Sequence, residues 1–156
     1  GYEPLDIVRL PVPDNFCCSV AHPAIMVSTR MAREVLPKDI PLRTAVKQWG
    51  NVAGLVAGLA LGDVHLVGRA MCDVVVEPYR KRFIPGFDEL REKVLAAGAL
   101  AMNISGAGPS VFTLSSDMAV AERVGEIMRE HFAEQGVGSD IYVCKVSNRG
   151  ARVLND

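Results

Sequence analysis

Two periods of hydrophobic residues alternate along the chain and predict a mixture of helices and strands. Apolar residues three and four apart indicate amphipathic helices, whereas short runs rich in β-branched and aromatic residues indicate strands. The predicted helices cover residues 28–36, 41–61, 63–74, 87–97 and 117–135, with a short helical turn that starts at residues 77–78. The predicted strands cover residues 6–12, 16–21, 99–104, 110–114 and 141–146, with a short edge strand at 151–154. From residue 16 onward the order is therefore strand, helices, strand, strand, helix, strand.

This order is that of the split β-α-β-β-α-β arrangement, with extra helices in the first crossover. The sequence therefore predicts an α+β, ferredoxin-like fold: an antiparallel sheet with helices on one face and an extended helical insertion. The chain has 156 residues, of which 49% are hydrophobic, so residues 1–156 fit a single domain with an ordinary core. The hairpin formed by the strands at 99–104 and 110–114 turns at residues 106–109.

Residues typical of helix ends support these boundaries. Pro41 suits the first turn of a helix and Gly62 its C-terminal cap, whereas Ser116 precedes the helix at 117–135 as an N-cap. From Gly50 to Gly62 a glycine recurs every four residues, which leaves a bare stripe on one face of the helix. Each glycine inside a helix costs about 1 kcal/mol relative to alanine. We therefore expect another helix or strand to pack closely against this stripe.

Composition and charge exclude several classes of protein. The net charge is −1, so no overall electrostatic field favours nucleic acid or an acidic membrane surface. The most apolar run, residues 52–61, falls well short of the roughly 20 residues that span a bilayer. The four cysteines show no Cys-x-x-Cys spacing, which indicates a reduced, cytoplasmic protein. The chain starts at Gly1 without an initiator methionine or a signal peptide, so we expect a fragment of a longer protein.

A glycine-rich loop, Ser105-Gly106-Ala107-Gly108-Pro109-Ser110, joins the two strands of the predicted hairpin. Glycines at 106 and 108 allow positive φ angles and close approach to the main chain, so the loop can present amide groups to an anion. It is not a Walker loop, because no Gly-Lys-Ser/Thr follows, and Val111 stands where the Gly-x-Gly-x-x-Gly fingerprint requires glycine. On pattern alone, an ordinary glycine-rich turn is the alternative interpretation.

Four other residues suit an anionic ligand. The hydroxyl groups of Ser28 and Thr29 and the guanidinium groups of Arg33 and Arg80 are suited to a carboxylate or a phosphate. Arg80 also begins a basic triplet, residues 80–82, which is held between prolines. A solvated, ion-paired surface is the alternative interpretation for these arginines.

The three histidines do not form a recognisable catalytic or metal-binding pattern. His22 is a candidate base, and a strand-end histidine bonded to the backbone is the alternative. His65 and His131 are expected on helix surfaces. No group of His, Cys and Asp has the spacing of a metal site, so the sequence predicts no metal ligand.

Four motifs together resemble a known family. Residues 105–111 are similar to the third signature of the GHMP kinase superfamily, which includes galactose, homoserine, mevalonate and phosphomevalonate kinases. Residues 2–5 (Tyr-Glu-Pro-Leu), 27–37 (Val-Ser-Thr-Arg-Met-Ala-Arg-Glu-Val-Leu-Pro) and 77–80 (Glu-Pro-Tyr-Arg) resemble the homoserine kinases within it. The resemblance extends from Gly1 to about Arg152, and four motifs in the family's order argue against chance agreement.

The resemblance implies the C-terminal half of a two-domain kinase. In such enzymes an N-terminal domain binds ATP, with magnesium, and carries a phosphate loop of the Pro-x-x-x-Gly-Leu-Gly-Ser-Ser-Ala type, which does not occur in this sequence. The whole enzyme would phosphorylate L-homoserine to O-phospho-L-homoserine on the route to threonine. The fragment alone is expected to be inactive.

The resemblance also implies roles for individual residues. Arg33 and Arg80 match the arginines that hold the substrate carboxylate, and Thr29 matches a catalytic residue near the transferring phosphate. The part of the loop that faces the nucleotide cleft consists of Ser105, Gly106, Ala107, Gly108 and Ser110. Ala107 departs from the family, in which serine is frequent at this position, so its side chain brings no hydroxyl group.

Three alternatives stay open at this point. The chain could belong to another kinase of the superfamily, or it could be a ferredoxin-like regulatory module that binds a small molecule without catalysis. A dimerisation domain, in which the sheet or the Gly50–Gly62 stripe contacts a second copy in a homodimer, is the third alternative. The segment that precedes Gly1 in the full-length protein would distinguish a kinase from a regulatory module.

Overall fold

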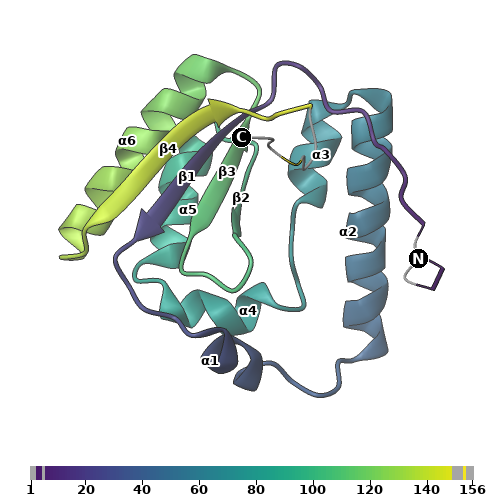
Figure 1. The fold of residues 1–156 in the computed structure, drawn as a ribbon, viewed down its shortest axis with the longest axis horizontal. Helices are drawn as coiled ribbons and strands as arrows, with labels where there is room; N and C mark the ends of the chain where they lie inside the picture. The colour runs from purple at the N-terminus through teal and green to yellow at the C-terminus, as the bar shows by residue number, and fades with distance from the viewer. Residues whose placement is uncertain (1–2, 5, 149–152, 154–156) are drawn as a thin grey trace.

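Four strands and six α-helices make up the part of the chain that a computed structural model describes, residues 3–4, 6–148 and 153 (Figure 1). The strands are β1 (Cys17–Pro23), β2 (Ala101–Ile104), β3 (Val111–Ser115) and β4 (Ser139–Lys145). The helices are α1 (Thr29–Glu34), α2 (Leu42–Leu61), α3 (Val64–Ala70), α4 (Glu77–Arg80), α5 (Phe87–Ala96) and α6 (Met118–Glu134), with a short 3-10 helix, η1 (Lys81–Phe83). The order of these elements agrees with the order predicted from residue 16 onward.

The four strands form one antiparallel sheet in the order β2-β3-β1-β4. This is the split β-α-β-β-α-β arrangement, in which each crossover leaves room for one strand between the two that it joins. β1 is central, so that Ser19 lies opposite Thr113 of β3 on one side and Val143 of β4 on the other. The predicted α+β, ferredoxin-like sheet is confirmed, and the hairpin of β2 and β3 carries the glycine-rich loop at its tip.

One face of the sheet is covered by α5 and α6 (Figure 1). Because side chains alternate along a strand, Ala21 and Val111 point to this face and join the main core together with Met128 of α6. Ser19 lies on the same face, and its Oγ donates a hydrogen bond of 2.6 Å to the carbonyl of Ala121. These contacts fix α6 directly on the central strand.

The opposite face of the sheet is only partly covered. Val20, Phe112 and Tyr142 share this face, because Val20 is paired with the other two across the sheet. Tyr142 is exposed, and the other two are half-buried. The helical insertion, α2 with α3, packs at one end of this face through a second apolar cluster that includes Leu55 and Leu114.

Helices α2 and α3 approach each other closely where two glycines of α2 face α3. A Cβ added to Gly58 would lie 2.8 Å from Cγ2 of Val67, and one added to Gly54 would lie 3.3 Å from Cβ of Ala70. Gly62 has another reason to be glycine, since it caps α2 with a φ of 68°. Close packing, as predicted for the glycine stripe, therefore applies to the middle of the stripe and not to its end.

Gly58→Ala is expected to destabilise the protein by about 1–3 kcal/mol, because the new methyl group would overlap Val67 in a packed core. The added Cβ would also lie 2.9 Å from the backbone nitrogen of Val67, which cannot retreat without moving α3. Gly50→Ala is the matched control on the same helix, where an added Cβ meets no atom within 4 Å. This control should be neutral or stabilising by up to about 1 kcal/mol. Urea unfolding measures both, and equal midpoints would contradict the account.

The predicted strand at residues 6–12 is wrong, since this segment has no regular structure. Pro11 and Pro13 bring no backbone N–H group, so the segment cannot offer a continuous row of donors to the edge of the sheet. The predicted edge strand at 151–154 lies outside the described residues apart from Val153, which is not in a strand. The edges of the described sheet are therefore β2 and β4.

Two helix ends differ from their predicted positions, and a side-chain hydrogen bond accounts for each difference. α3 ends at Ala70 rather than near Val74, whose backbone N–H donates to Oε1 of Gln48 at 3.0 Å. The N-cap of α6 is Asp117, whose side chain accepts from the backbone of the first turn, so the predicted cap at Ser116 is wrong. Hydrophobic periodicity does not register such local hydrogen bonds.

Exposed apolar side chains follow one another along the side of α2. We call this surface the outer face of α2, and it consists of Leu42, Val46, Trp49 and Val56. Contiguous exposed apolar residues typically mark a surface that binds another protein surface. Among the described residues, none of the helices combines the length and the apolar character that crossing a membrane requires.

Candidate functional site

Arg80, the last residue of α4, holds three segments of the chain together. Its Nε donates to the carbonyl of Ala32 in α1 at 3.0 Å, and its Nη1 donates to the carbonyl of Gly106 in the glycine-rich loop at 3.0 Å. These partners are 48 and 26 residues away in the sequence. The structure therefore brings the backbone of α1, Arg80 and the loop to one place.

Helix α1 displays Thr29 and Arg33 at the protein surface. Ser28 caps the helix, and its Oγ accepts from a backbone N–H of the first turn. Ala32 is fully buried and holds the helix against the rest of the domain, whereas Thr29 and Arg33 are exposed. Arg33 is the residue next to Ala32, whose carbonyl accepts the hydrogen bond from Arg80.

Arg30 and Lys81 form ion pairs, whereas the side chain of Arg33 forms none with the described residues. Arg30 pairs with Glu34 at 2.8 Å, and Lys81 pairs with Asp88 at 2.6 Å. Exposed pairs of this kind contribute no more than about 1 kcal/mol. The side chain of Arg33 forms no hydrogen bond or ion pair with the described residues. Its guanidinium group is therefore available to a ligand.

The glycine-rich loop owes its shape to two backbone hydrogen bonds and two positive φ angles. The N–H of Ser105 donates to the Ser110 carbonyl at 2.8 Å, and the N–H of Gly108 donates to the Ser105 carbonyl at 3.0 Å. Gly106 and Gly108 have φ angles of 58° and 80°, which favour glycine. The N–H groups of Gly106 and Ala107 donate to no backbone carbonyl of the described residues, so they are available to an anion.

His22 contacts this loop from the end of β1. Its Nδ1 lies 2.7 Å from Oγ of Ser110. The sequence allowed a catalytic base or a histidine bonded to backbone, and the partner is instead a side chain of the loop. Ala21 lies opposite Val111 in the sheet, and this register brings His22 beside Ser110. Predicting this contact would have required the register of β1 and β3, which the sequence does not specify.

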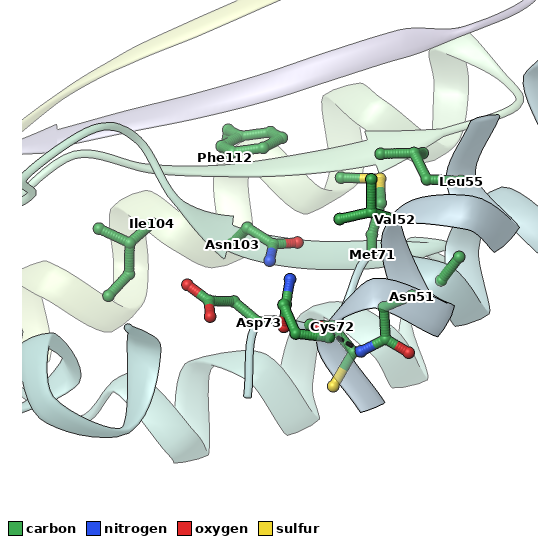
Figure 2. Close-up of a pocket in the computed structure, with 11 residues that line it drawn as sticks. Asn51, Val52, Leu55, Met71, Cys72, Asp73, Asn103, Ile104 and Phe112 are labelled. Carbon is green, nitrogen blue, oxygen red and sulfur yellow. Dashed lines mark hydrogen bonds between the residues drawn. The ribbon is translucent and has the colours of Figure 1, made fainter. Parts of the chain in front are cut away.

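A cavity of about 200 Å³ lies beside Arg80 and the loop, and Asp73, Glu77 and Asn103 also line it. A groove of about 260 Å³ adjoins it, because both are lined by Asp73 and Asn103 (Figure 2). Figure 2 shows Asn51 of α2 on the opposite side of this groove from the strand that carries Asn103. The helical insertion thus supplies one wall of the space that leads to Arg80.

A partly buried ion pair anchors α4. Glu77, the first residue of α4, accepts two hydrogen bonds from Arg91 of α5, one of them from Nη1 to Oε1 at 2.6 Å. Arg91 also donates to the carbonyl of Met102 at 2.9 Å and lies over the ring of Phe87. Burial disfavours the charge of Arg91, but its hydrogen bonds to Glu77 raise its pKa above the ordinary value. No sequence spacing pointed to Arg91, which fixes the helix that carries Arg80.

The site offers charge and hydrogen bonds rather than a nucleophile. Arg33, the remaining N–H groups of Arg80 and the loop amides can bind carboxylate or phosphate oxygens. Asp73 is a candidate ligand for Mg²⁺, but its oxygens accept from the backbone N–H groups of Val76 at 2.8 Å and Glu77 at 3.2 Å. Both oxygens of Asp73 are therefore engaged by backbone N–H groups at the start of α4, and the donor groups of the site fit an anion such as a phosphate better than a metal ion.

A family model and curated relatives match this chain. Residues 55–134 match the family model described as GHMP kinases C terminal. The chain is 47% identical over 156 residues to a homoserine kinase of Chlorobium phaeobacteroides (strain DSM 266) and 40% identical over 151 residues to that of Thermococcus gammatolerans. These matches cover 99% and 97% of this chain but 49% and 50% of the relatives. The chain thus spans about half the length of the curated relatives it matches.

Solved structures agree with the family match. The crystal structure of homoserine kinase from Cytophaga hutchinsonii has a TM-score of 0.92 and 49% sequence identity, and the match covers 96% of this chain and 48% of that chain. Phosphomevalonate kinase of Streptococcus pneumoniae shares the fold, with a TM-score of 0.60 and 14% identity. The residues matched by the family model include Arg80 and the whole glycine-rich loop. The chain therefore belongs to the GHMP kinase family, of which it carries the C-terminal domain.

Proposed function

We propose that the full-length protein is a homoserine kinase, which transfers the γ-phosphate of ATP to L-homoserine to give O-phospho-L-homoserine in threonine biosynthesis. The observation that carries this proposal is that Arg80 joins the backbone of α1 to the glycine-rich loop. A cavity lies beside Arg80 and Gly106. Relatives at 47% and 40% identity are homoserine kinases, which supports homoserine over mevalonate or galactose as the acceptor.

In this proposal Arg33 and Arg80 bind the carboxylate of homoserine. Arg80 uses Nε and Nη1 for backbone carbonyls, which leaves the N–H groups of Nη2 for the substrate. Arg33 adds a planar donor group that no described residue engages. Thr29, exposed at the start of α1, would lie near the transferring phosphoryl group, and the amides of Gly106 and Ala107 would face the nucleotide phosphates. Phosphoryl transfer depends mostly on positioning and charge neutralisation, so this domain needs no nucleophile of its own.

We assign the binding of ATP and Mg²⁺ mainly to an N-terminal domain that precedes residues 1–156 in the full-length protein. The half-length coverage of the relatives supports this division, as does the engagement of both Asp73 oxygens by backbone N–H groups. The outer face of α2 offers an apolar surface for that domain or, in a homodimer, for a second copy. All four cysteines are free, which supports the proposal of a cytoplasmic location.

A coupled assay of ADP release tests the proposal. With ATP and Mg²⁺, the full-length protein is expected to phosphorylate L-homoserine and not mevalonate or galactose. The isolated 156-residue chain should be inactive, because the ATP-binding domain is assigned to the other half. Turnover of mevalonate or galactose without turnover of homoserine would identify another kinase of the superfamily. Binding of a small molecule without turnover of any substrate would favour a regulatory module.

A further inference from the structure

Helices α5 and α6 bring together a group of side chains that the proposed kinase function does not use. Glu89 of α5 and His131 and Glu134 of α6 each offer one potential ligand atom, and these atoms all lie within 4.8 Å of one another. His131 and Glu134 are three residues apart and therefore share one face of their helix. The sequence showed no metal-ligand spacing because the third member comes from a different helix.

His131 is the unusual member of this group. The sequence predicted it on a helix surface, but its side chain is 0% exposed, so that prediction is wrong. Gly86 makes room for the ring, since an added Cβ there would lie 2.4 Å from Nε2. Nε2 lies 3.4 Å from the carbonyl of Pro85, whereas Nδ1 has no hydrogen-bond partner among the described residues. A buried polar atom without a partner is costly.

The surroundings of His131 favour the form of the ring that binds metals. A carbonyl oxygen can only accept, so the Pro85 carbonyl favours the tautomer in which Nε2 carries the proton. Nδ1 then keeps its lone pair. Metal-binding histidines typically donate their other ring N–H to a carbonyl or carboxylate in this way, which fixes both the tautomer and the ring orientation.

A cation already lies between the two carboxylates. Nζ of Lys93 lies 2.9 Å from Oε1 of Glu89 and 3.0 Å from Oε2 of Glu134. The position therefore favours positive charge. The ammonium group satisfies both carboxylates but leaves Nδ1 of His131 unpaired, whereas a metal ion could bind all three.

We propose that Glu89, His131 and Glu134 form a binding site for a divalent transition metal ion of the Zn²⁺ class, which competes with the ammonium group of Lys93. One imidazole nitrogen and two carboxylate oxygens are ligands that Zn²⁺ accepts, and they leave a fourth tetrahedral position to water. Mg²⁺ and Ca²⁺ are disfavoured by the imidazole ligand. A cavity of about 320 Å³ lies beside this group and is lined by Lys93, His131 and Glu134.

Metal binding requires a small movement of exposed side chains. Two ligand atoms that each lie about 2.1 Å from a tetrahedral ion are about 3.4 Å apart. The ligand atoms, now separated by up to 4.8 Å, must therefore draw together as Lys93 leaves. Glu89 and Glu134 are exposed and can move, whereas His131 is buried and held in place by the residues packed around it.

Zinc titration of the metal-stripped, full-length protein without nucleotide tests the proposal, with a chromophoric chelator as competitor. We expect saturable binding of a single Zn²⁺ at this site. His131→Gln and Glu134→Gln should weaken the affinity by at least about tenfold. Lys93→Gln removes the competing ammonium group and should tighten binding by at least about tenfold. Glu92→Gln, an exposed carboxylate of α5 outside the group, is the matched control and should leave the affinity unchanged.

The variants of exposed residues keep the test independent of folding. His131 is buried, and its substitution could weaken the fold, but Glu89→Gln and Glu134→Gln alter exposed side chains. The absence of zinc binding in the unchanged protein would overturn the proposal. Equal affinity in the unchanged protein and in Glu134→Gln would overturn it as well, because the ion would then be bound elsewhere. Failure of Lys93→Gln to tighten binding would remove the competition from the proposal.

Discussion

Arg80→Ala in the full-length protein is expected to lower kcat/KM for L-homoserine by about 10- to 100-fold, with a much smaller change in KM for ATP. The substitution removes the proposed contact with the substrate carboxylate. It also removes the hydrogen bonds to the carbonyls of Ala32 and Gly106, each 3.0 Å long, that hold α1 and the glycine-rich loop together. Both losses affect the side of the site that we assign to the acceptor. Steady-state kinetics with each substrate varied in turn measure the effect.

Arg33→Ala separates the two roles of Arg80. The side chain of Arg33 is exposed and forms no hydrogen bond or ion pair with the described residues, so its loss should raise KM for homoserine without lowering the melting temperature. Arg80→Ala should do both, since each lost hydrogen bond contributes about 1 kcal/mol. Arg30→Ala is the matched control, because Arg30 is paired with Glu34 on the same helix. Unchanged homoserine kinetics in both the Arg33 and the Arg80 variants would remove the carboxylate site from this account.

The second large effect is expected from Gly108→Val, which should remove most of the activity and destabilise the protein by about 1–2 kcal/mol or more. Gly108 has a φ of 80°, which a β-branched residue adopts only under strain. The added Cβ would lie 3.3 Å from Cγ2 of Ile104, so the side chain would press on β2 as well. Kinetics with both substrates and the melting temperature measure the two consequences.

Gly106 provides the control for this experiment. Its φ of 58° is also positive, but an added Cβ would meet no atom within 4 Å. Gly106→Asn should therefore retain more stability than Gly108→Val, because asparagine tolerates this backbone region. Normal activity of Gly108→Val would show that the loop does not need to approach the nucleotide closely.

The fold was predictable because its elements are marked locally. Apolar stripes identify α5 and α6 as helices, and β-branched runs identify the two segments around the glycine-rich loop as strands. Few topologies are compatible with the order of these elements. The prediction of a strand at residues 6–12 was wrong. Polar and apolar residues alternate there, but Pro11 and Pro13 have no backbone N–H group to donate to a neighbouring strand. A period of two indicates a strand only where the backbone can also pair.

The site was predictable in part. Residue type and motif predicted an anion-binding role for Arg80, which stays a prediction. They could not show that two of its donor atoms bind the carbonyls of Ala32 and Gly106. These contacts depend on how a helix 48 residues away packs. The burial of His131 escaped prediction for a similar reason, since the room for its ring is made by Gly86, which is distant in sequence. The pattern of apolar residues along one helix indicates which of its faces is buried. It does not show how much space a neighbouring segment leaves for a particular side chain.

The outer face of α2 has a practical consequence. Trp49 is the only tryptophan in the sequence, and it is 62% exposed at the middle of that face. Indole fluorescence in water is red-shifted, and it moves to shorter wavelengths when another protein surface displaces the solvent. This chain therefore carries an intrinsic optical reporter of whatever binds along α2, and no label has to be attached to read it.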